Sequence, residues 1–279
     1  INYRFGTSDS YSHNLKKIGI QSDELIVNCI PLQNKWAKEN NLNVLNISSK
    51  IPHKLFKLPL IKSKISSLRS IFKIALEQIK NYSPDVLYCQ DISFFPKEIL
   101  NKIKQEHHVK LLVGQIACPL PPKSFIEPYD LIITSFPHFI NKLRSQGINS
   151  EYLKIGFDER ILDYCKITKR DIEFSFVGGI SKHHSFAFKN IEYLTSKGDM
   201  KIFGYGADKL PINSLVRKNH KGVKWGLDMY SILAKSKISF NRHINSAENN
   251  ANNMRLYEAT GMGSLLLTDM KDNLHKIFE

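Results

Sequence analysis

Two charged residues one helical turn apart, Arg255 and Glu258, are the best placed for binding chemistry in this sequence. They lie in a stretch with helical spacing, 253–262, which begins at Asn252 or Asn253, because an asparagine can accept a hydrogen bond from a free helix amide. The amino end of a helix attracts anions through its unpaired N–H groups and its dipole. A guanidinium in the first turn suits a phosphate. The carboxylate one turn later is placed to accept hydrogen bonds from a pair of hydroxyls, as on a ribose.

The residues that follow predict that this helix lies against a parallel sheet. Gly261 and Gly263 suit the left-handed residue that often ends a helix. The apolar run 264–268 then indicates a strand covered on both faces. A helix that opens toward the carboxyl edge of a parallel sheet is a natural anion site.

A glycine loop earlier in the same half is a second candidate for anion binding. The predicted strand 173–177 leads into Gly178 and Gly179 and then into a polar loop that contains Lys182. Successive backbone N–H groups in such a loop can cradle an anion. We therefore expect Gly179 and Lys182 to touch a diphosphate or the acceptor side of the site.

A cationic pair follows the next predicted strand, 237–240. Arg242 and His243 come directly after it and can neutralise a departing diphosphate, as a metal ion does in other transferases. A structural histidine with satisfied hydrogen bonds is the alternative for His243. The sequence has no Asp-x-Asp to chelate a metal between phosphates. It therefore predicts a site that holds no metal and uses protein cations.

The alternation of predicted strands and helices indicates an α/β fold in two layered domains. Strands are predicted at 24–29, 85–90, 110–114, 130–134 and 152–157, and then at 173–177, 201–203, 237–240 and 264–268. Polar residues follow several of them, at the edge where open α/β sheets bind ligands. The best linker between the domains is the polar segment 157–170.

The amino-acid composition favours some classes of binding partner and argues against others. The 279 residues include 40 Lys and Arg against 26 Asp and Glu, a net charge of +14. A basic balance suits anionic substrates such as sugar nucleotides, although a Lys-rich composition can also reflect codon bias. The lysines are not interleaved with aromatic residues, so no nucleic-acid partner is predicted. The basic segment 52–80 allows peripheral contact with an anionic membrane, or else forms an ordinary helix with a solvated lysine face.

The cysteines and the apolar runs favour a cytoplasmic protein. Cys29, Cys89, Cys118 and Cys165 lie far apart without metal-type spacing, as expected of reduced thiols. No apolar run reaches the roughly 18 residues that a membrane helix needs. Because the first residue is Ile1, we expect the sequence to be a fragment of a longer protein.

Three segments of the sequence resemble those of a known protein family. NNMRLYEATGMGSLLLTD and DNLHKIFE near the end, and NCIPLQNKWAKEN near the beginning, resemble the GT-B glycosyltransferases of group 1, specifically the subset with the spore-maturation-type glycosyltransferases. The resemblance implies two Rossmann-like domains that face one another across a cleft. These would be an acceptor-side domain at 1–165 and an incomplete nucleotide-sugar domain at 166–279.

The resemblance also assigns roles to individual residues. It implies that Asn253 and Met254 hold the nucleotide diphosphate and that Glu258 holds the ribose. The family's turn near the nucleotide base falls on residues 204–206, which are Gly204, Tyr205 and Gly206, and Trp225 lies where the family reads the base. Many retaining members carry a further Glu at the position of Asn250, which leaves the stereochemical outcome open.

The activity implied is metal-independent transfer of a sugar from a nucleotide-diphosphate donor to a carbohydrate or lipid-linked acceptor, without any cofactor. The setting implied is bacterial surface polysaccharide or glycoconjugate synthesis, in the cytoplasm or at the inner face of the membrane. An inverting enzyme would need a general base from the first domain. Asp9 is the first choice, followed by Asp91 and His138. The alternatives are a sugar-nucleotide epimerase of the same fold and a non-catalytic module that binds a nucleotide or a partner.

Overall fold

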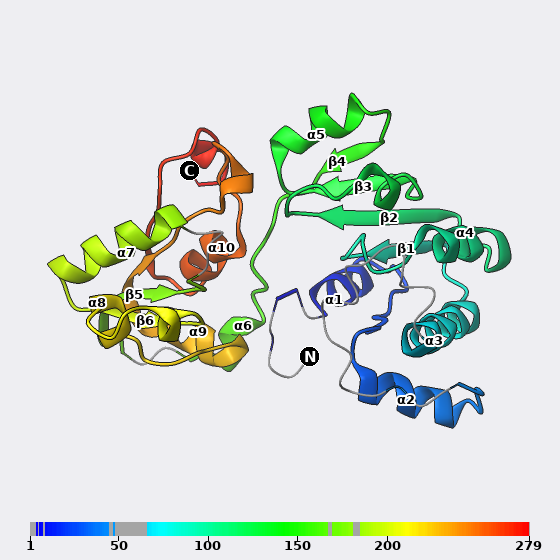
Figure 1. Cartoon of the computed structure of the whole chain (residues 1–279), viewed down its shortest axis with the longest axis horizontal. Helices are drawn as coiled ribbons and strands as arrows, with labels where there is room; N and C mark the ends of the chain where they lie inside the picture. Colours follow the sequence, from blue (N-terminus) through cyan, green and yellow to red (C-terminus); the bar gives the residue numbers. More distant parts are fainter. Residues whose placement is uncertain are drawn as a thin grey trace. The chain divides into compact units, whose positions relative to one another are not determined.

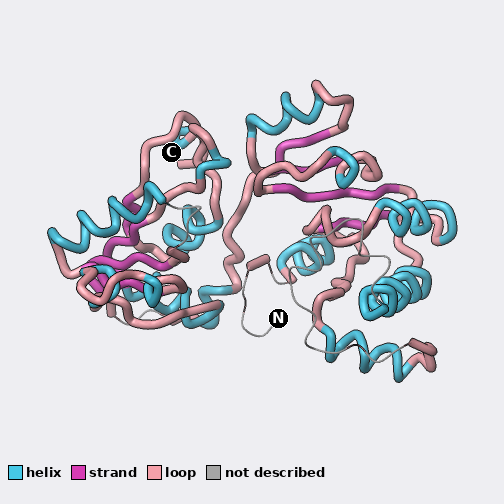
Figure 2. Tube along the Cα trace, viewed as in Figure 1, coloured by secondary structure: helices cyan, strands magenta, loops and turns pink. Residues whose placement is uncertain are grey.

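A computed structural model of the chain (Figure 1) describes residues 4, 6–7, 9–44, 47, 66–166, 169–180 and 185–278. The chain forms two compact units, one of residues 23–153 and the other of residues 1–22 together with 154–279. Each unit contains a parallel sheet (Figure 2). These sheets, with helices between their strands, confirm the predicted α/β class.

The division into units differs from the predicted domains 1–165 and 166–279 at both ends of the first domain. Residues 1–22 and 154–165 belong to the same compact unit as the latter part of the chain. Polar contacts account for this grouping, because residues 4–17 bind side chains of residues 158–164. For example, Ser10 Oγ donates to Asp158 Oδ2 at 2.6 Å, and Arg4 Nη2 donates to the Tyr164 hydroxyl at 3.1 Å.

The unit of residues 23–153 is a sheet built in sequence order. Its four strands are parallel and neighbour one another as β1-β2-β3-β4. The described elements are α2 (Ile30–Glu39), α3 (Ser66–Tyr82), β1 (Val86–Cys89), α4 (Lys97–Glu106), β2 (Leu111–Ile116), η3 (Lys123–Phe125), β3 (Leu131–Thr134), α5 (Pro137–Arg144) and β4 (Ser150–Tyr152). The three strands predicted between residues 85 and 134 are confirmed.

Two sequence expectations in this unit are wrong. The predicted strand 24–29 is irregular, and the carbonyl of Ile26 accepts from the Gln33 side chain at 3.0 Å rather than from a neighbouring strand. The predicted strand 152–157 is limited to Ser150–Tyr152, since pairing with β3 ends at Tyr152. In both places the sequence has the apolar pattern of a strand, but the described residues contain no neighbouring strand with which these positions pair.

Helix α3 turns its apolar stripe into the protein. Leu68, Ile71, Ile74 and Ala75 recur at helical spacing and are each 0% exposed. This stripe is therefore not available to a membrane, and the described part of the segment 52–80 behaves as a core helix. Residues 52–65 lie outside the described part.

The second unit contains the sheet β6-β5-β7-β8, also four parallel strands. After β6 the chain returns to the other side of β5, so the direction of strand addition reverses between β5 and β7. The described elements are α1 (Ser10–Lys17), α6 (Ile161–Tyr164), β5 (Ile172–Val177), α7 (Ser185–Lys197), β6 (Met200–Phe203), η5 (Ala207–Lys209), α8 (Leu215–Lys218), α9 (Gly226–Lys235), β7 (Ser236–Phe240), η6 (Asn245–Ala247), α10 (Met254–Gly261), β8 (Leu265–Leu267) and η7 (Leu274–Lys276). We call the position between the carboxyl ends of β5 and β7 the switch point, where open α/β sheets bind ligands.

Two apolar clusters cover this sheet on opposite faces. Neighbouring residues of β5 divide between them, because side chains alternate along a strand: Phe176 joins one cluster and Val177 the other. The first packs with Ile191 of α7, and the second with Leu233 of α9 and Ala259 of α10. Helices α9 and α10 thus share one face of the sheet, which fixes α10 beside the strand ends.

One arginine holds the carboxyl ends of both helices. Arg170 Nη1 donates to the carbonyls of Ala234 at 2.8 Å and Ser236 at 3.2 Å, and its Nη2 donates to Met262 at 3.1 Å. The last carbonyls of a helix have no partner within it and carry partial negative charge, so a cation satisfies both needs. Arg170 therefore helps to set the direction in which α10 points.

The strand β8 is more exposed than its sequence suggests. Leu265 is 67% exposed and Leu267 42% exposed, so the expected burial on both faces is wrong. β8 is the last strand on its side of the sheet. No helix among the described residues covers the face that carries these two leucines.

Candidate functional site

The amino end of α10 lies at the switch point. Asn253 caps the helix, since its Oδ1 accepts from the Leu256 N–H at 3.2 Å. Its Nδ2 donates to Asn241 Oδ1 at 2.9 Å and to the carbonyl of Arg242 at 3.2 Å, both just beyond the end of β7. The predicted helix and its asparagine cap are confirmed, with the helix at Met254–Gly261.

The first amides of α10 are available to a ligand. Met254 and Arg255 are the first two helical residues, and their N–H groups precede the first hydrogen bond within a helix. The cap satisfies the Leu256 N–H instead. Free amides and the positive end of the helix dipole together attract an anion at this end.

Arg255 points into the protein rather than outward. Its Nε donates to the carbonyl of Val177 at the end of β5, at 3.1 Å, and its Nη2 contacts the Met229 sulfur at 3.1 Å. Its Nη1 lies 2.8 Å from Glu258 Oε2. The guanidinium thus joins α10 to β5, and the predicted phosphate contact would require it to leave these partners.

The Glu258 carboxylate is buried and occupied on both sides. Glu258 is 5% exposed, and its Oε1 accepts from the Tyr230 hydroxyl at 3.2 Å. Burial and the adjacent Glu258 charge raise the pKa of Tyr230, which keeps this hydroxyl a donor. Tyr230 comes from α9 and was not foreseen, because its part in the site depends on how α9 and α10 pack. A ribose would share or replace this hydroxyl.

The loops after β5 and β6 lie against one another. The Gly178 N–H donates to the carbonyl of Phe203 at 2.9 Å, and the Ile180 N–H donates to that of Tyr205, also at 2.9 Å. Gly204 has φ +135°, and a Cβ there would lie 2.0 Å from the Gly178 oxygen. A side chain at this position would both strain the backbone and clash with the facing loop.

An aromatic pair stands over this glycine loop. The rings of Tyr205 and Trp225 stack with centroids 5.9 Å apart at 17°, and the two residues are 47% and 48% exposed. A Cβ on Gly179 would lie 2.2 Å from the Tyr205 ring, so a larger residue there would have to displace this ring. Gly206, with φ +94°, completes the turn. Lys182, the remaining predicted contact of this region, lies outside the described residues.

Arg242 and His243 follow β7 but differ in their surroundings. Arg242 is half-buried, and its guanidinium makes no ion pair or hydrogen bond with any residue in the described part of the chain. His243 is 4% exposed, and its Nδ1 lies 2.8 Å from Asp269 Oδ1, beyond the end of β8. Asp269 was not foreseen as a partner. It follows the apolar run 265–267 just as Arg242 and His243 follow 236–240.

The catalytic candidates of residues 23–153 lie at one edge of their sheet. Asp91 follows β1, and its Oδ1 accepts from the Ser93 N–H at 2.9 Å and the Ser93 hydroxyl at 2.5 Å. His138 is in the first turn of α5, after β3, and its ring packs against Phe136 and Phe139 with centroids 5.3 and 4.6 Å away. Strand β2 separates β1 from β3, so the two strands that precede these residues lie about 10 Å apart.

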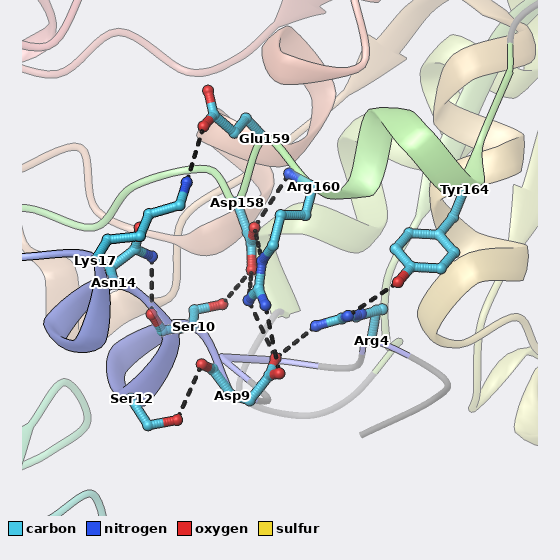
Figure 3. Close-up of polar contacts among 10 residues, drawn as sticks. All are labelled: Arg4, Asp9, Ser10, Ser12, Asn14, Lys17, Asp158, Glu159, Arg160 and Tyr164. Carbon is cyan, nitrogen blue, oxygen red and sulfur yellow. Dashed lines mark hydrogen bonds and ion pairs between the residues drawn. The ribbon is translucent and has the colours of Figure 1, made fainter. Parts of the chain in front are cut away.

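Asp9 does not belong to this edge. It lies in the unit that contains 154–279, between two arginines (Figure 3), with its Oδ1 2.5 Å from Arg4 Nη1 and 3.1 Å from Arg160 Nη2. Burial alone would raise the pKa of Asp9, but the Arg160 hydrogen bond and the charges of both arginines outweigh it and lower the pKa. Asp9 therefore lies outside the compact unit that contains Asp91 and His138. A carboxylate with a lowered pKa is also a weak general base.

The described residues contain no group of three or more His, Cys, Asp or Glu side chains that could hold a metal ion. None of the helices in the described ranges is both long enough and apolar enough to cross a membrane.

Comparisons with known proteins give a match to a sequence family and similarities in fold to solved structures. A family described as "Glycosyl transferase-like" matches residues 183–279, which include α7 through η7. No curated protein matches the chain. An alpha-glucosyltransferase solved in complex with UDP-glucose and DNA containing an abasic site is 14% identical with a TM-score of 0.48, over 87% of this chain and 76% of that one. A candidate UDP-N-acetylglucosamine 2-epimerase from Listeria monocytogenes is 11% identical with a TM-score of 0.39, over 75% of this chain, which spans 65% of the epimerase chain.

Proposed function

We propose that this chain transfers a sugar from a nucleoside diphosphate donor to an acceptor hydroxyl. One observation carries the proposal: the free amino end of α10 lies at the switch point of a parallel sheet, within the segment 183–279 that matches a glycosyl transferase-like family. A helix end at such a position suits a diphosphate, because amides and dipole act together.

The diphosphate would bind the free N–H groups of Met254 and Arg255. Arg242 supports this role because its guanidinium has no counter-ion among the described residues and its own carbonyl is bonded to the helix cap. As the bond to the sugar breaks, negative charge grows on the leaving diphosphate. Fixed cations and amides stabilise that charge without reorganising, which lowers the barrier. In our proposal these groups take the place of a metal ion.

The nucleoside would extend from the phosphates toward the glycine loop. The half-exposed rings of Tyr205 and Trp225 offer a flat surface for a nucleotide base. Glu258 would accept from the ribose hydroxyls while Arg255 holds its second oxygen. Because the Tyr230 hydroxyl occupies the first oxygen, we expect Tyr230 to move or to share it when the ribose binds.

The general base would come from the sheet edge of residues 23–153. Asp91 and His138 both lie at the carboxyl end of that sheet, and the two-arginine environment of Asp9 leaves it the weaker choice. A base must be unprotonated and yet retain affinity for the proton it takes. We assign the acceptor, a carbohydrate or a lipid-linked sugar, to this unit.

The proposal is tested by calorimetric titration with uridine, guanosine and adenosine diphosphates, each separately. At least one should bind the wild-type chain, and Arg242→Ala should weaken that binding about 10-fold, as expected for a charge-assisted hydrogen bond. Lys218→Ala, which removes the same charge from exposed α8, is the matched control and should bind as wild type does. Failure of all three diphosphates to bind would refute the proposal.

A product assay separates transfer from its enzymatic rival. A transferase releases nucleoside diphosphate in proportion to the acceptor consumed. An epimerase changes the sugar while it is attached to the nucleotide and needs no acceptor. Conversion of a nucleotide sugar without any acceptor, with the diphosphate linkage intact in the product, would overturn the transferase assignment.

A further inference from the structure

Buried His243 and half-buried Asp269 form a pair beyond the carboxyl ends of β7 and β8. Both the ring Nδ1 and the backbone N–H of His243 approach Asp269 Oδ1, at 2.8 and 3.3 Å. The other carboxylate oxygen lies 3.4 Å from Lys271 Nζ. The Asp269 carboxylate is thus held by the ring and backbone N–H of His243 and by Lys271.

Asp269 determines which nitrogen of His243 carries the proton between them. Burial alone would raise the pKa of Asp269, but the hydrogen bonds and charge of His243, together with Lys271, outweigh it and lower the pKa. Asp269 therefore remains a carboxylate, which can only accept hydrogen bonds. Nδ1 of His243 must be the donor, and Nε2 is the nitrogen left for another partner.

That second nitrogen has no hydrogen-bond partner among the described residues. Nε2 of His243 is buried without a hydrogen bond, and the side chain is 0% exposed. Native structures pair nearly all buried polar atoms, because an unpaired one is costly. The sequence allowed His243 to be a structural histidine with both ring nitrogens hydrogen-bonded, but in the described structure only Nδ1 has a partner. Nε2 is the atom that a ligand-binding histidine would present to its ligand.

The pair adjoins the proposed phosphate site. The residue before His243 gives its carbonyl to the Asn253 side chain at 3.2 Å, and Asn253 caps the helix whose amides are free. The loops after β7 and β8 are further joined by Lys271 Nζ to the Glu248 carbonyl, at 2.6 Å, and by Asn273 to Ala251. Together they form one assembly of polar contacts beside the amino end of α10.

We propose that Asp269 is a positioning residue that holds His243 so that its Nε2 donates a hydrogen bond to the diphosphate of the donor. This inference rests on the proposed function. With Nε2 protonated, Nδ1 keeps its bond to Asp269 and the imidazolium charge lies between the carboxylate and the phosphate. Because Nε2 is shielded in the free chain, the loops after β7 and β8 separate locally as the diphosphate enters.

Two substitutions at the same position distinguish this role from a structural one. An asparagine amide at 243 can reach the place of Nδ1 and keep the Asp269 contact, whereas a glutamine amide can reach the place of Nε2. We expect His243→Asn to weaken diphosphate binding about 10-fold and His243→Gln to weaken it less. A purely structural histidine predicts the opposite order, because the Asp269 contact would then be the one that matters.

The positioning residue has its own matched pair of variants. Asp269→Asn keeps the shape but loses the charge that holds the imidazolium, so binding should weaken by several-fold. Asp272→Asn makes the same change at an exposed residue three positions further along and should bind as wild type does. Equal binding by both variants would show that Asp269 does not position His243 for diphosphate binding.

The measurement is calorimetric titration with uridine, guanosine and adenosine diphosphates, with the Tm of each free variant as a check on folding. In the wild-type chain, ¹⁵N NMR of His243 should show the Nε2 resonance moving to a protonated position on saturation. If the wild-type chain binds none of the three, the proposed function and this inference fail together. If it binds one but His243→Asn binds equally well, or Nε2 does not shift, this inference alone fails.

Discussion

The two parallel sheets of this chain differ in strand order and in what gathers at their carboxyl ends. In residues 23–153 each new strand is added on the same side, and β2 separates Asp91 from His138. In the other unit the order reverses after β6, and the amino end of α10 lies at the reversal. Arg255 then reaches back to the Val177 carbonyl at the end of β5, at 3.1 Å.

The difference shows how topology makes a site. At a reversal, successive connections leave the sheet on opposite sides and open a crevice between two strand ends. A sheet without a reversal offers no such place among its described strands, even though polar residues follow them. We therefore assign the diphosphate to the reversed sheet and acid-base chemistry to the other.

The buried ion pair of the reversed sheet should be the most costly to break. Arg255→Met leaves the Glu258 carboxylate buried and charged, which should lower the free energy of unfolding by about 3–5 kcal/mol. Adding Glu258→Gln should restore part of the loss, because the uncompensated charge disappears. Urea unfolding of the two single variants and the double variant measures the coupling.

The matched control lies in the other unit, between α4 and the residue before β3. Lys104 and Asp130 pair at 2.5 Å, but their side chains are 37% and 30% exposed. Lys104→Met should therefore cost only about 1 kcal/mol or less. If Lys104→Met lowered the free energy of unfolding as much as Arg255→Met, the ion pairs of the two units would not differ in their contribution to stability.

The glycine turn after β6 should be the next most sensitive feature. Gly204→Ala combines a φ of +135° with a Cβ 2.0 Å from the Gly178 oxygen, so we expect a loss of about 2–4 kcal/mol. Gly198→Ala, in open space within the same unit, should change stability by less than about 1 kcal/mol. Thermal unfolding compares the two variants. A tolerated alanine at 204 would mean that the facing loops are not held together as described.

A substitution at the helix cap tests the anion site with a smaller expected effect on stability. Asn253→Asp keeps an oxygen for the Leu256 N–H but loses the donor to Asn241 and places a negative charge beside the diphosphate. We expect a stability loss of about 1 kcal/mol and a larger loss in diphosphate affinity, about 10-fold. Calorimetric titration and urea unfolding on the same sample measure both. Unchanged affinity would place the ligand elsewhere.

The smallest effect concerns pH. Arg160 and Ser10 hydrogen-bond Asp158 and, against the opposing effect of burial, lower the pKa of Asp158 to about 2. A lowered folded-state pKa stabilises the fold above about pH 4, where the unfolded carboxyl is ionised, and this stability is lost as the pH falls from about 4 toward 2. After solvent screening we expect about 1 kcal/mol or less.

The pH prediction also has a control in the other unit. Arg160→Gln should flatten the decline of the unfolding free energy between pH 4 and 2. Arg144→Gln, which breaks a pair with Glu151 whose side chains are 53% and 67% exposed, should leave the decline unchanged. Parallel pH profiles for the wild type and Arg160→Gln would show that these contacts contribute nothing.

The sequence was sufficient for features that local chemistry determines. The Asn253 cap, the helix that follows it and the strands β1 to β3 all follow from side-chain periodicity and capping. The inward direction of Arg255 could not be foreseen, because it depends on the β5 carbonyl 78 residues away. The Asp269 contact of His243 likewise depends on β7 and β8 being neighbours.

The domain boundary also depends on contacts between residues that are far apart in the sequence. The polar segment 157–170 was a reasonable linker by composition. In the structure, Asp158 and Arg160 bind Ser10 and Asp9 within one compact unit, so part of the segment is packed rather than linking. Charge pattern along the chain carries no information about partners roughly 150 residues away, whereas the folded contacts do.

In our proposal the amino end of α10 holds a diphosphate. The most direct measurement is the change in backbone ¹H–¹⁵N resonances on titration with the nucleoside diphosphate that binds. We predict the largest shifts at Met254 and Arg255, with smaller ones at Arg242 and Tyr205. Shifts centred on Asp91 and His138, with the α10 amides unchanged, would contradict the assignment.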